Sequence, residues 1–121
     1  MKGIVLFAHG ARDPDWALPF QRIRDSFAAA CTDRPVILAY LEWMQPPLAQ
    51  AVGELSIRGA TEIVVVPLFM AQGSHLKRDL PLLIEAASQA NGGIAIQVLP
   101  PIGDVIGIAT AIVGLIEAET R

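Results

Sequence analysis

The chain has 121 residues, of which 9 are Lys or Arg and 12 are Asp or Glu, so its formal net charge is −3. Hydrophobic residues make up 53% of the sequence, which excludes a disordered chain, because disorder requires low hydrophobicity and high net charge. The acidic balance also excludes a general nucleic-acid-binding protein, since that function needs a cationic surface to displace counterions. A length near 120 residues is typical of one domain, and we expect residues 1–121 to form a single domain.

The sequence does not predict a membrane protein. The longest run of apolar or small residues covers positions 105–116, which is too short to cross a bilayer. His9, Arg12 and Asp13 interrupt the apolar start of the chain before it reaches the length of a signal peptide. The one cysteine, Cys31, cannot form an internal disulfide, which fits a reducing compartment. We therefore expect a cytoplasmic protein without a membrane partner, whose surplus apolar surface packs inside or against another subunit.

Four strands and four helices are predicted in alternation along the chain. The first three predicted strands are continuous apolar runs, which are typical of parallel strands buried on both faces, and the fourth is weaker and shows partial alternation. In the segments between them, apolar residues recur every three or four positions, which indicates helices. In chain order, the predicted strands are residues 3–8, 36–41, 62–68 and 94–99, and the predicted helices are residues 14–31, 47–58, 80–90 and 105–119.

Local signals set the ends of the predicted helices. Asp13, Asp79 and Asp104 are predicted N-caps of the first, third and fourth helices. Pro19 lies inside the first helical pattern, so we expect its first turn to be short or kinked. Gly59 is the expected C-cap residue of the second helix. The alternation predicts an α/β fold, a three-layer sandwich in which a four-stranded parallel sheet carries helices on both faces.

Three chemically active side chains follow the first three predicted strands. His9 directly follows the first strand, Glu42 ends the second, and His75 lies in the loop after the third. Because ligands of open parallel sheets bind beyond the carboxyl ends of the strands, we expect these side chains to share one rim. Two imidazoles and a carboxylate suit a divalent transition-metal ion, and the same imidazoles could take up protons instead. The alternative is that each histidine bonds the loop backbone and that the glutamate is an ordinary strand-end carboxylate.

The two loops that carry the histidines also contain glycines and cations. Gly10 and Gly73 suit tight turns or a close approach of the backbone to a ligand. Arg12, Lys77 and Arg78 add positive charge to a protein that is acidic overall, as an anionic ligand requires. A solvated charged rim is the alternative interpretation of these cations.

Several common catalytic motifs are absent from the sequence. It contains no G-x-x-x-x-G-K-[ST] phosphate loop and no G-x-G-x-x-G after a strand, so we expect no nucleotide cofactor. It also lacks a G-x-S-x-G nucleophile elbow and a cysteine pair for redox chemistry or structural zinc.

Four short motifs resemble those of the sirohydrochlorin chelatases of the CbiX/SirB type. The sequence HGARDP begins at His9, and VVVPLFMAQGSHLKRDLP covers residues 64–81. The pair Leu41-Glu42 and the sequence PPIG at 100–103 occur in the same order and at the spacing of that family. Each motif is short, but four in register across nearly the whole chain make a specific resemblance.

The resemblance implies a class II chelatase, an enzyme that inserts a divalent metal ion into a tetrapyrrole without ATP. By this resemblance His9, Glu42 and His75 would be catalytic and would hold the metal substrate, Co²⁺ or Fe²⁺, with Glu42 completing the set or taking a pyrrole proton. The product would serve cobalamin or siroheme synthesis, and residues 1–121 would form one chelatase domain. Long family members carry two such domains in tandem, so a short chain is expected to form a homodimer. The predicted contacts with the carboxylate-rich sirohydrochlorin are Gly10, Arg12, Gly73, Ser74, Lys77 and Arg78.

Two other functions stay open at this point. Family members continue the PPIG motif with a His-Pro, whereas this chain has Asp104-Val105. A non-catalytic carrier of metal or tetrapyrrole with the same fold is therefore one alternative. An α/β enzyme that binds a phosphate ligand through Arg12 and the glycine turns is the other.

Overall fold

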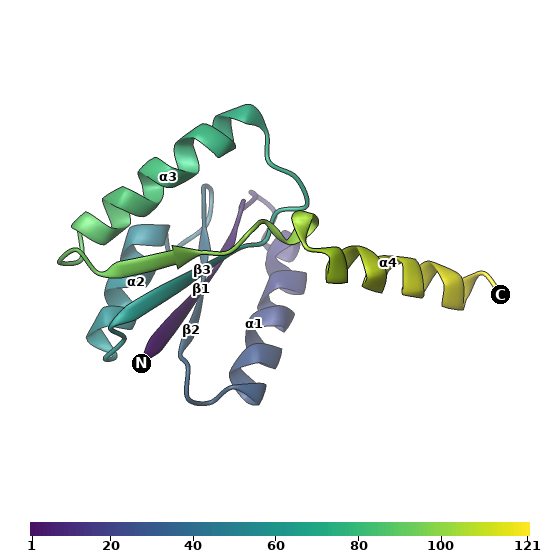
Figure 1. The fold of residues 1–121 in the computed structure, drawn as a ribbon, viewed down its shortest axis with the longest axis horizontal. Coiled ribbons are helices and arrows are strands. Elements are labelled where there is room, and N and C mark those ends of the chain that lie inside the picture. Colours follow the sequence, from purple (N-terminus) through teal and green to yellow (C-terminus); the bar gives the residue numbers. More distant parts are fainter.

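The computed structural model describes residues 1–121 as a parallel sheet whose strands are joined by helices (Figure 1). The four strands are β1 (Lys2–Ala8), β2 (Val36–Tyr40), β3 (Glu62–Pro67) and β4 (Ala95–Val98), and their order in the sheet is β2-β1-β3-β4. The four helices are α1 (Leu18–Ala30), α2 (Leu48–Ile57), α3 (Ser74–Gln89) and α4 (Ile106–Glu119). Two short 3₁₀ turns, Pro14–Ala17 and Ile102–Asp104, precede α1 and α4.

The two faces of the sheet are covered to different extents. Helices α2 and α3 pack together over one face, where Phe7, Ile63 and Val65 are buried in the larger core cluster. On the other face α1 packs against β2, and Leu6 and Leu38 belong to a smaller cluster. Burial on both faces explains the continuous apolar runs of β1, β2 and β3, whereas the edge strand β4 is mostly exposed. The expected α/β fold, with a four-stranded parallel sheet and helices on both faces, is confirmed.

Helix α4 projects away from the sheet instead of packing on it (Figure 1). It follows the 3₁₀ turn Ile102–Asp104, and none of its residues is buried. A fourth helix was predicted at 105–119, and its bounds agree with the structure within one residue. No helix of the chain combines the length and the apolar character that a bilayer crossing requires.

The predicted N-cap is right for the first helical segment and wrong for the third and fourth helices. The Asp13 carboxylate accepts a hydrogen bond from the Asp15 N–H at 2.9 Å, as an N-cap does. Helix α3 begins at Ser74, six residues earlier than predicted, so Asp79 lies inside it. Its first turn is exposed and lacks the apolar periodicity on which the prediction relied. Val105 takes the N-cap position of α4, while Asp104 belongs to the preceding 3₁₀ turn.

Candidate active site

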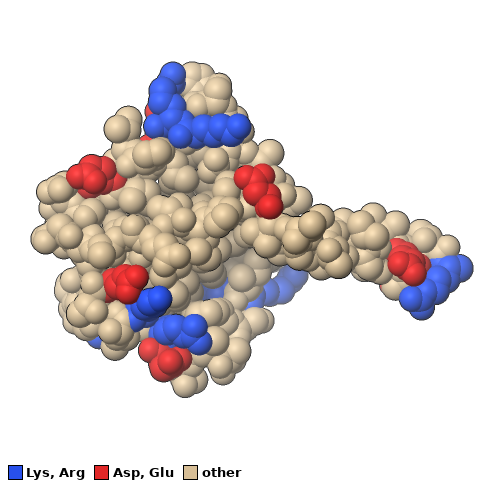
Figure 2. Space-filling view, viewed as in Figure 1, with Lys and Arg blue, Asp and Glu red and all other residues tan.

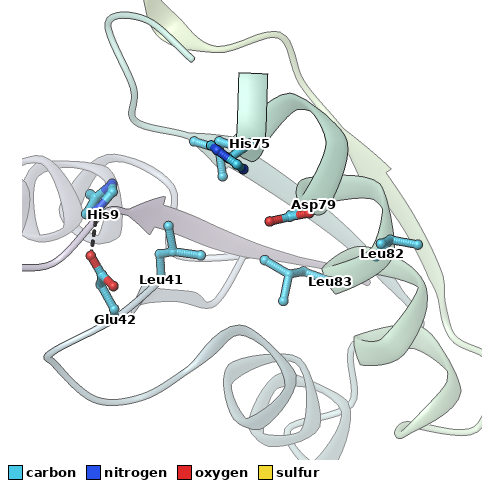
Figure 3. Close-up of a pocket in the computed structure, with 8 residues that line it drawn as sticks. His9, Leu41, Glu42, His75, Asp79, Leu82 and Leu83 are labelled. Atoms are coloured by element: carbon cyan, nitrogen blue, oxygen red, sulfur yellow. Dashed lines mark hydrogen bonds and ion pairs between the residues drawn. The ribbon is translucent and has the colours of Figure 1, made fainter. Parts of the chain in front are cut away.

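A pocket of about 510 Å³ lies beyond the carboxyl ends of β1 and β2 and against α3 (Figure 3). It combines two imidazoles and two carboxylates with four leucine side chains. The lining residues are His9, Leu41, Glu42, His75, Leu76, Asp79, Leu82 and Leu83. The structure therefore brings His9, Glu42 and His75 to one cavity on the predicted rim of the sheet.

Backbone bonds beyond the ends of β1 and β2 hold His9 next to Glu42. The Leu41 N–H donates to the Ala8 carbonyl at 2.9 Å, and the Glu42 N–H donates to the His9 carbonyl at 3.0 Å. Gly10 follows with a φ of +92°, and a Cβ at this position would clash with the Glu42 carbonyl oxygen. A residue with a side chain is therefore strained here for two reasons, its left-handed backbone and the lack of space.

The side chains of His9 and Glu42 form a hydrogen-bonded pair. His9 Nε2 lies 2.8 Å from Glu42 Oε1, and both side chains are about half exposed. Because an ionised carboxylate only accepts hydrogen bonds, Nε2 carries the proton, and the neutral ring keeps a free lone pair on Nδ1. A carboxylate that bonds a histidine in this way fixes the tautomer and the orientation of the ring. Nδ1 of His9 can thus accept a proton or bind a metal ion.

His75 lies in the first turn of α3, not in a loop as predicted. Arg78 Nη2 lies 2.8 Å from His75 Nδ1, and a guanidinium can only donate, so Nδ1 is the acceptor. The neutral ring of His75 therefore carries its proton on Nε2. Asp79 follows His75 by four positions, which places both on one side of the helix, and both line the pocket. In this arrangement Nδ1, the only ring nitrogen of His75 with a free lone pair, already accepts a hydrogen bond from Arg78.

The two pairs occupy opposite walls of the pocket (Figure 3). His9, Glu42 and Leu41 lie on the side of the strand ends, and His75, Asp79 and Leu83 lie on the side of α3. No three His, Cys, Asp or Glu side chains come close enough together to hold a metal ion. The ligand set of His9, Glu42 and His75 is thus not assembled in the free chain and stays a prediction for the chain with substrate bound.

The predicted substrate contacts lie at the rim of this region. The Arg12 guanidinium stacks 4.1 Å from the ring centre of Trp43, an exposed residue with a φ of +67°. Lys77 and Arg78 are exposed on the first turns of α3, where Figure 2 shows Lys and Arg side chains gathered. Gly73 is the N-cap residue of α3 and Ser74 its exposed first residue. Contact of these residues, or of Gly10, with a substrate stays a prediction.

Sequence reasoning missed Asp79 as a pocket residue, because it was predicted to be an N-cap. Its spacing of four from His75 is the signal that would have identified it, once the helix was extended to the histidine. Sequence reasoning also assigned no leucine to the pocket, although Leu82 is exposed and lines it together with Leu76 and Leu83.

Comparisons with known proteins give the family of the chain. The CbiX family profile matches residues 3–119. The chain belongs to the CbiX family. Among its relatives in that family is the sirohydrochlorin cobaltochelatase of Saccharolobus islandicus, 36% identical over 86 residues, a match that covers 69% of this chain and 64% of the relative. The sirohydrochlorin cobaltochelatase of Methanothermobacter thermautotrophicus is 31% identical over 90 residues, covering 74% of this chain and 62% of the relative. The matches thus span less than two thirds of the length of these relatives.

Solved structures of CbiX and SirB proteins have the same fold. A cobalamin (vitamin B12) biosynthesis CbiX protein from Marinobacter aquaeolei superposes with a TM-score of 0.87 at 30% identity, covering 98% of this chain and 97% of that chain. The sirohydrochlorin chelatase SirB from Bacillus subtilis in complex with cobalt gives a TM-score of 0.81 at 24% identity, covering 97% of this chain and 50% of that chain. One CbiX-family chain thus corresponds in fold to half of that longer SirB chain.

Proposed function

We propose that this CbiX-family protein inserts a divalent metal ion, Co²⁺ or Fe²⁺, into sirohydrochlorin without a nucleotide cofactor, on the route to cobalamin or siroheme. The observation that carries the proposal is the His9–Glu42 pair, which faces His75 and Asp79 across a leucine-lined pocket. The names of the relatives support the same reaction, since they are sirohydrochlorin cobaltochelatases.

Metal insertion needs proton acceptors beside the ring, because the metal ion replaces two pyrrole N–H protons. His9 offers the free lone pair of Nδ1, and the carboxylate of Glu42 stabilises the imidazolium that forms when Nδ1 takes a proton. Asp79, on the opposite wall, is placed to accept the second proton. Two acceptors on opposite sides of one pocket allow the two protons to leave separately.

The other pocket residues suit a flat, anionic macrocycle. Leu41, Leu82 and Leu83 provide apolar contact for its face. Arg12, Lys77 and Arg78 are exposed at the rim and would meet its carboxylates with charge-assisted hydrogen bonds. A homodimer belongs to this proposal, because one chain lines only part of an open pocket and a second copy would help to enclose the ring.

The test is an anaerobic absorbance time course of sirohydrochlorin with Co²⁺, and then with Fe²⁺, against a reaction without enzyme. We expect a spectral change faster than this control, and expect it to be strongly slowed in His9→Ala and Glu42→Gln. Glu85→Gln is the matched control for the second variant, since Glu85 is an exposed carboxylate further along α3 that bonds only Gln89.

Each outcome of this experiment assigns a function. If only one equivalent of tetrapyrrole per protein chain changes its spectrum, the protein binds without turnover. This result would indicate a carrier of the same fold and overturn the proposed enzyme. No response to either metal or to the tetrapyrrole would overturn both and favour a phosphate ligand, to be tested by direct binding of inorganic phosphate.

A further inference from the structure

Two arginine–aromatic pairs of the chain lie at opposite edges of the sheet. The Arg12 guanidinium lies 4.1 Å from the ring centre of Trp43, in the loops beyond the carboxyl ends of β1 and β2. The Arg34 guanidinium lies 5.7 Å from the ring centre of Phe27, at the edge where β2 begins. Arg34 also donates through Nε to the Asp33 carboxylate at 3.4 Å, whereas Arg12 forms neither a salt bridge nor a side-chain hydrogen bond. The closer stacking contact is thus made by the arginine that has no carboxylate partner.

Trp43 contacts Arg12 from a strained position of the backbone. Its φ of +67° lies in the left-handed region, and no other residue of the chain except glycines has a positive φ. The Met44 N–H donates to the Glu42 carbonyl at 2.8 Å, which closes a three-residue γ-turn around Trp43. The side chain is 58% exposed, so burial in the core does not compensate for the strain. Strain of this kind persists only where the surrounding structure imposes it, and it is concentrated at functional sites.

The loop after β1 holds this turn in place. Gly10 has no side chain and so leaves room for the Glu42 carbonyl oxygen, which accepts the hydrogen bond of the γ-turn. The Glu42 N–H donates to the His9 carbonyl at 3.0 Å, which ties the two loops together at their first residues. Trp43 directly follows Glu42, and Arg12 follows His9 by three positions. The stacked pair therefore lies in the same two loops as the proposed base.

We infer that Trp43 is a positioning residue, which holds the Arg12 guanidinium ready to bind a peripheral carboxylate of the tetrapyrrole. Sirohydrochlorin is the ligand of the proposed function, on which this inference rests. Stacking covers one face of the guanidinium and leaves the N–H groups at its edge free, because they lie in the plane of the group. A carboxylate accepts two of these N–H groups in parallel, and bidentate pairs of this kind are among the strong hydrogen bonds of proteins.

Arg12 differs in this respect from the cations on α3. Arg78 contacts both His75, at 2.8 Å, and Asp79, at 3.5 Å, so its N–H groups are partly occupied. Lys77 has an ammonium group, which lacks the planar fork that matches a carboxylate. An exposed arginine normally loses rotamer freedom when it binds a ligand, but the stacked Arg12 has lost part of this freedom on folding. Trp43 should therefore affect the binding of substrate and leave the chemical step unchanged.

The first test measures KM and kcat of metal insertion for Trp43→Gly, since glycine adopts a φ of +67° without strain and only the ring is lost. We expect KM for sirohydrochlorin to rise by about fivefold or more and kcat to change by less than about twofold. Trp43→Phe keeps an aromatic face and should stay within about threefold of the wild-type KM. Arg34→Lys, which alters the other stacked arginine, is the matched control and should change neither constant. A wild-type KM in Trp43→Gly, or a loss confined to kcat, would overturn the inference.

The second test is a double-mutant cycle between Trp43→Gly and Arg12→Lys. Lysine keeps the positive charge but loses the planar fork, so Arg12→Lys should raise KM by about tenfold or more. Because Trp43 acts through the guanidinium, the double variant should have a KM no more than about twofold above that of Arg12→Lys. If the two effects multiply, Trp43 does not act through Arg12, and if Arg12→Lys has the wild-type KM, charge alone is enough. Either result would overturn the inference.

Binding without metal separates this inference from the proposed reaction. The dissociation constant of sirohydrochlorin is measured by equilibrium dialysis for the wild type, Trp43→Gly and Arg34→Lys. If the wild type binds the tetrapyrrole but inserts no metal, and only Trp43→Gly weakens binding by about fivefold or more, the reaction fails and the role of Trp43 stands. If the wild type inserts metal and Trp43→Gly binds as tightly as the wild type, the reaction stands and the role of Trp43 is overturned. A wild type that does not bind the tetrapyrrole would overturn both.

Discussion

The two walls of the pocket carry similar side chains, a histidine and a carboxylate each, but the chain holds them differently. His9 and Glu42 follow adjacent parallel strands, and backbone hydrogen bonds continue between these strands up to the two residues. His75 and Asp79 lie on the first turns of α3, whose N-cap Gly73 provides no side-chain hydrogen bond and has open space around it. The first wall is thus fixed by the sheet, whereas the second depends on the position of a helix end.

This difference separates two chemical tasks. A base must be oriented before the reaction, and the carboxylate of Glu42 orients the His9 ring in the free chain. The His75 ring is bonded to Arg78 instead, so it must exchange this partner before it can bind a metal ion. We therefore expect the strand wall to act as the preformed base and the helix wall to adapt to the substrate.

The largest effect is expected from removing the base itself. His9→Ala should lower the rate of metal insertion by roughly 100- to 10,000-fold, the usual contribution of a positioned acid or base. His75→Ala should lower it less, by about tenfold, because its ring is not oriented for the reaction. Initial rates of the absorbance change measure both variants. Equal losses would contradict the division of tasks and indicate that the two histidines act together as metal ligands.

A smaller effect is expected from disturbing the orientation of the base. Gly10→Ala introduces a Cβ against the Glu42 carbonyl at a left-handed position, so it should cost about 3 kcal/mol of unfolding free energy. Displacing Glu42 should also slow metal insertion by on the order of 100-fold.

Gly73→Ala is the matched control on the other wall. Gly73 has a φ of −71° and no atom near the position of a Cβ, so this change should cost less than about 1 kcal/mol. Urea denaturation and insertion rates would be measured for both glycine variants. If Gly73→Ala is as damaging as Gly10→Ala, the helix wall is as constrained as the strand wall.

Removing the hydrogen bond between Arg78 and His75 should raise the affinity for a metal ion by a few-fold. Arg78→Ala removes the donor to Nδ1, so a metal ion no longer competes with a hydrogen bond worth about 1 kcal/mol. We expect Co²⁺ to bind the free protein about fivefold more tightly in titration calorimetry. The same change should raise KM for the anionic tetrapyrrole, because a rim cation is lost. Unchanged Co²⁺ affinity would indicate that His75 does not bind the metal.

The smallest effect concerns Tyr40, the last residue of β2, two positions before Glu42. Burial raises the pKa of Tyr40, and the positive charge of Arg24 opposes this shift only in part. Above pH 10 the unfolded chain therefore loses this proton before the folded chain does, so stability falls as the pH rises further. Urea midpoints at pH 8 and pH 10.5 should differ less for Tyr40→Phe than for the wild type. An identical difference would show that Tyr40 does not contribute to alkaline unfolding.

The sequence predicted the sheet and one wall of the pocket well. Strands buried on both faces have a recognisable pattern, and His9 and Glu42 stand directly after two of them, so their place at the carboxyl edge followed from topology. Helix α3 was predicted six residues short, because its first turn is exposed and carries the polar residues of the site. Periodicity reports burial, so it fails where a helix leaves the core to present functional side chains.

The sequence by itself therefore determined the alternation of strands and helices, the apolar character of α4 and the identity of the polar side chains at the strand ends. Only the tertiary structure decided that His9 bonds Glu42 and that Arg78 donates a hydrogen bond to His75. It also decided that α4 projects away from the sheet. Propensity and periodicity act over a few neighbouring residues. The partners of a side chain, and the direction of a helix after a turn, depend on contacts between residues far apart in the chain, such as Gly103 with Phe69.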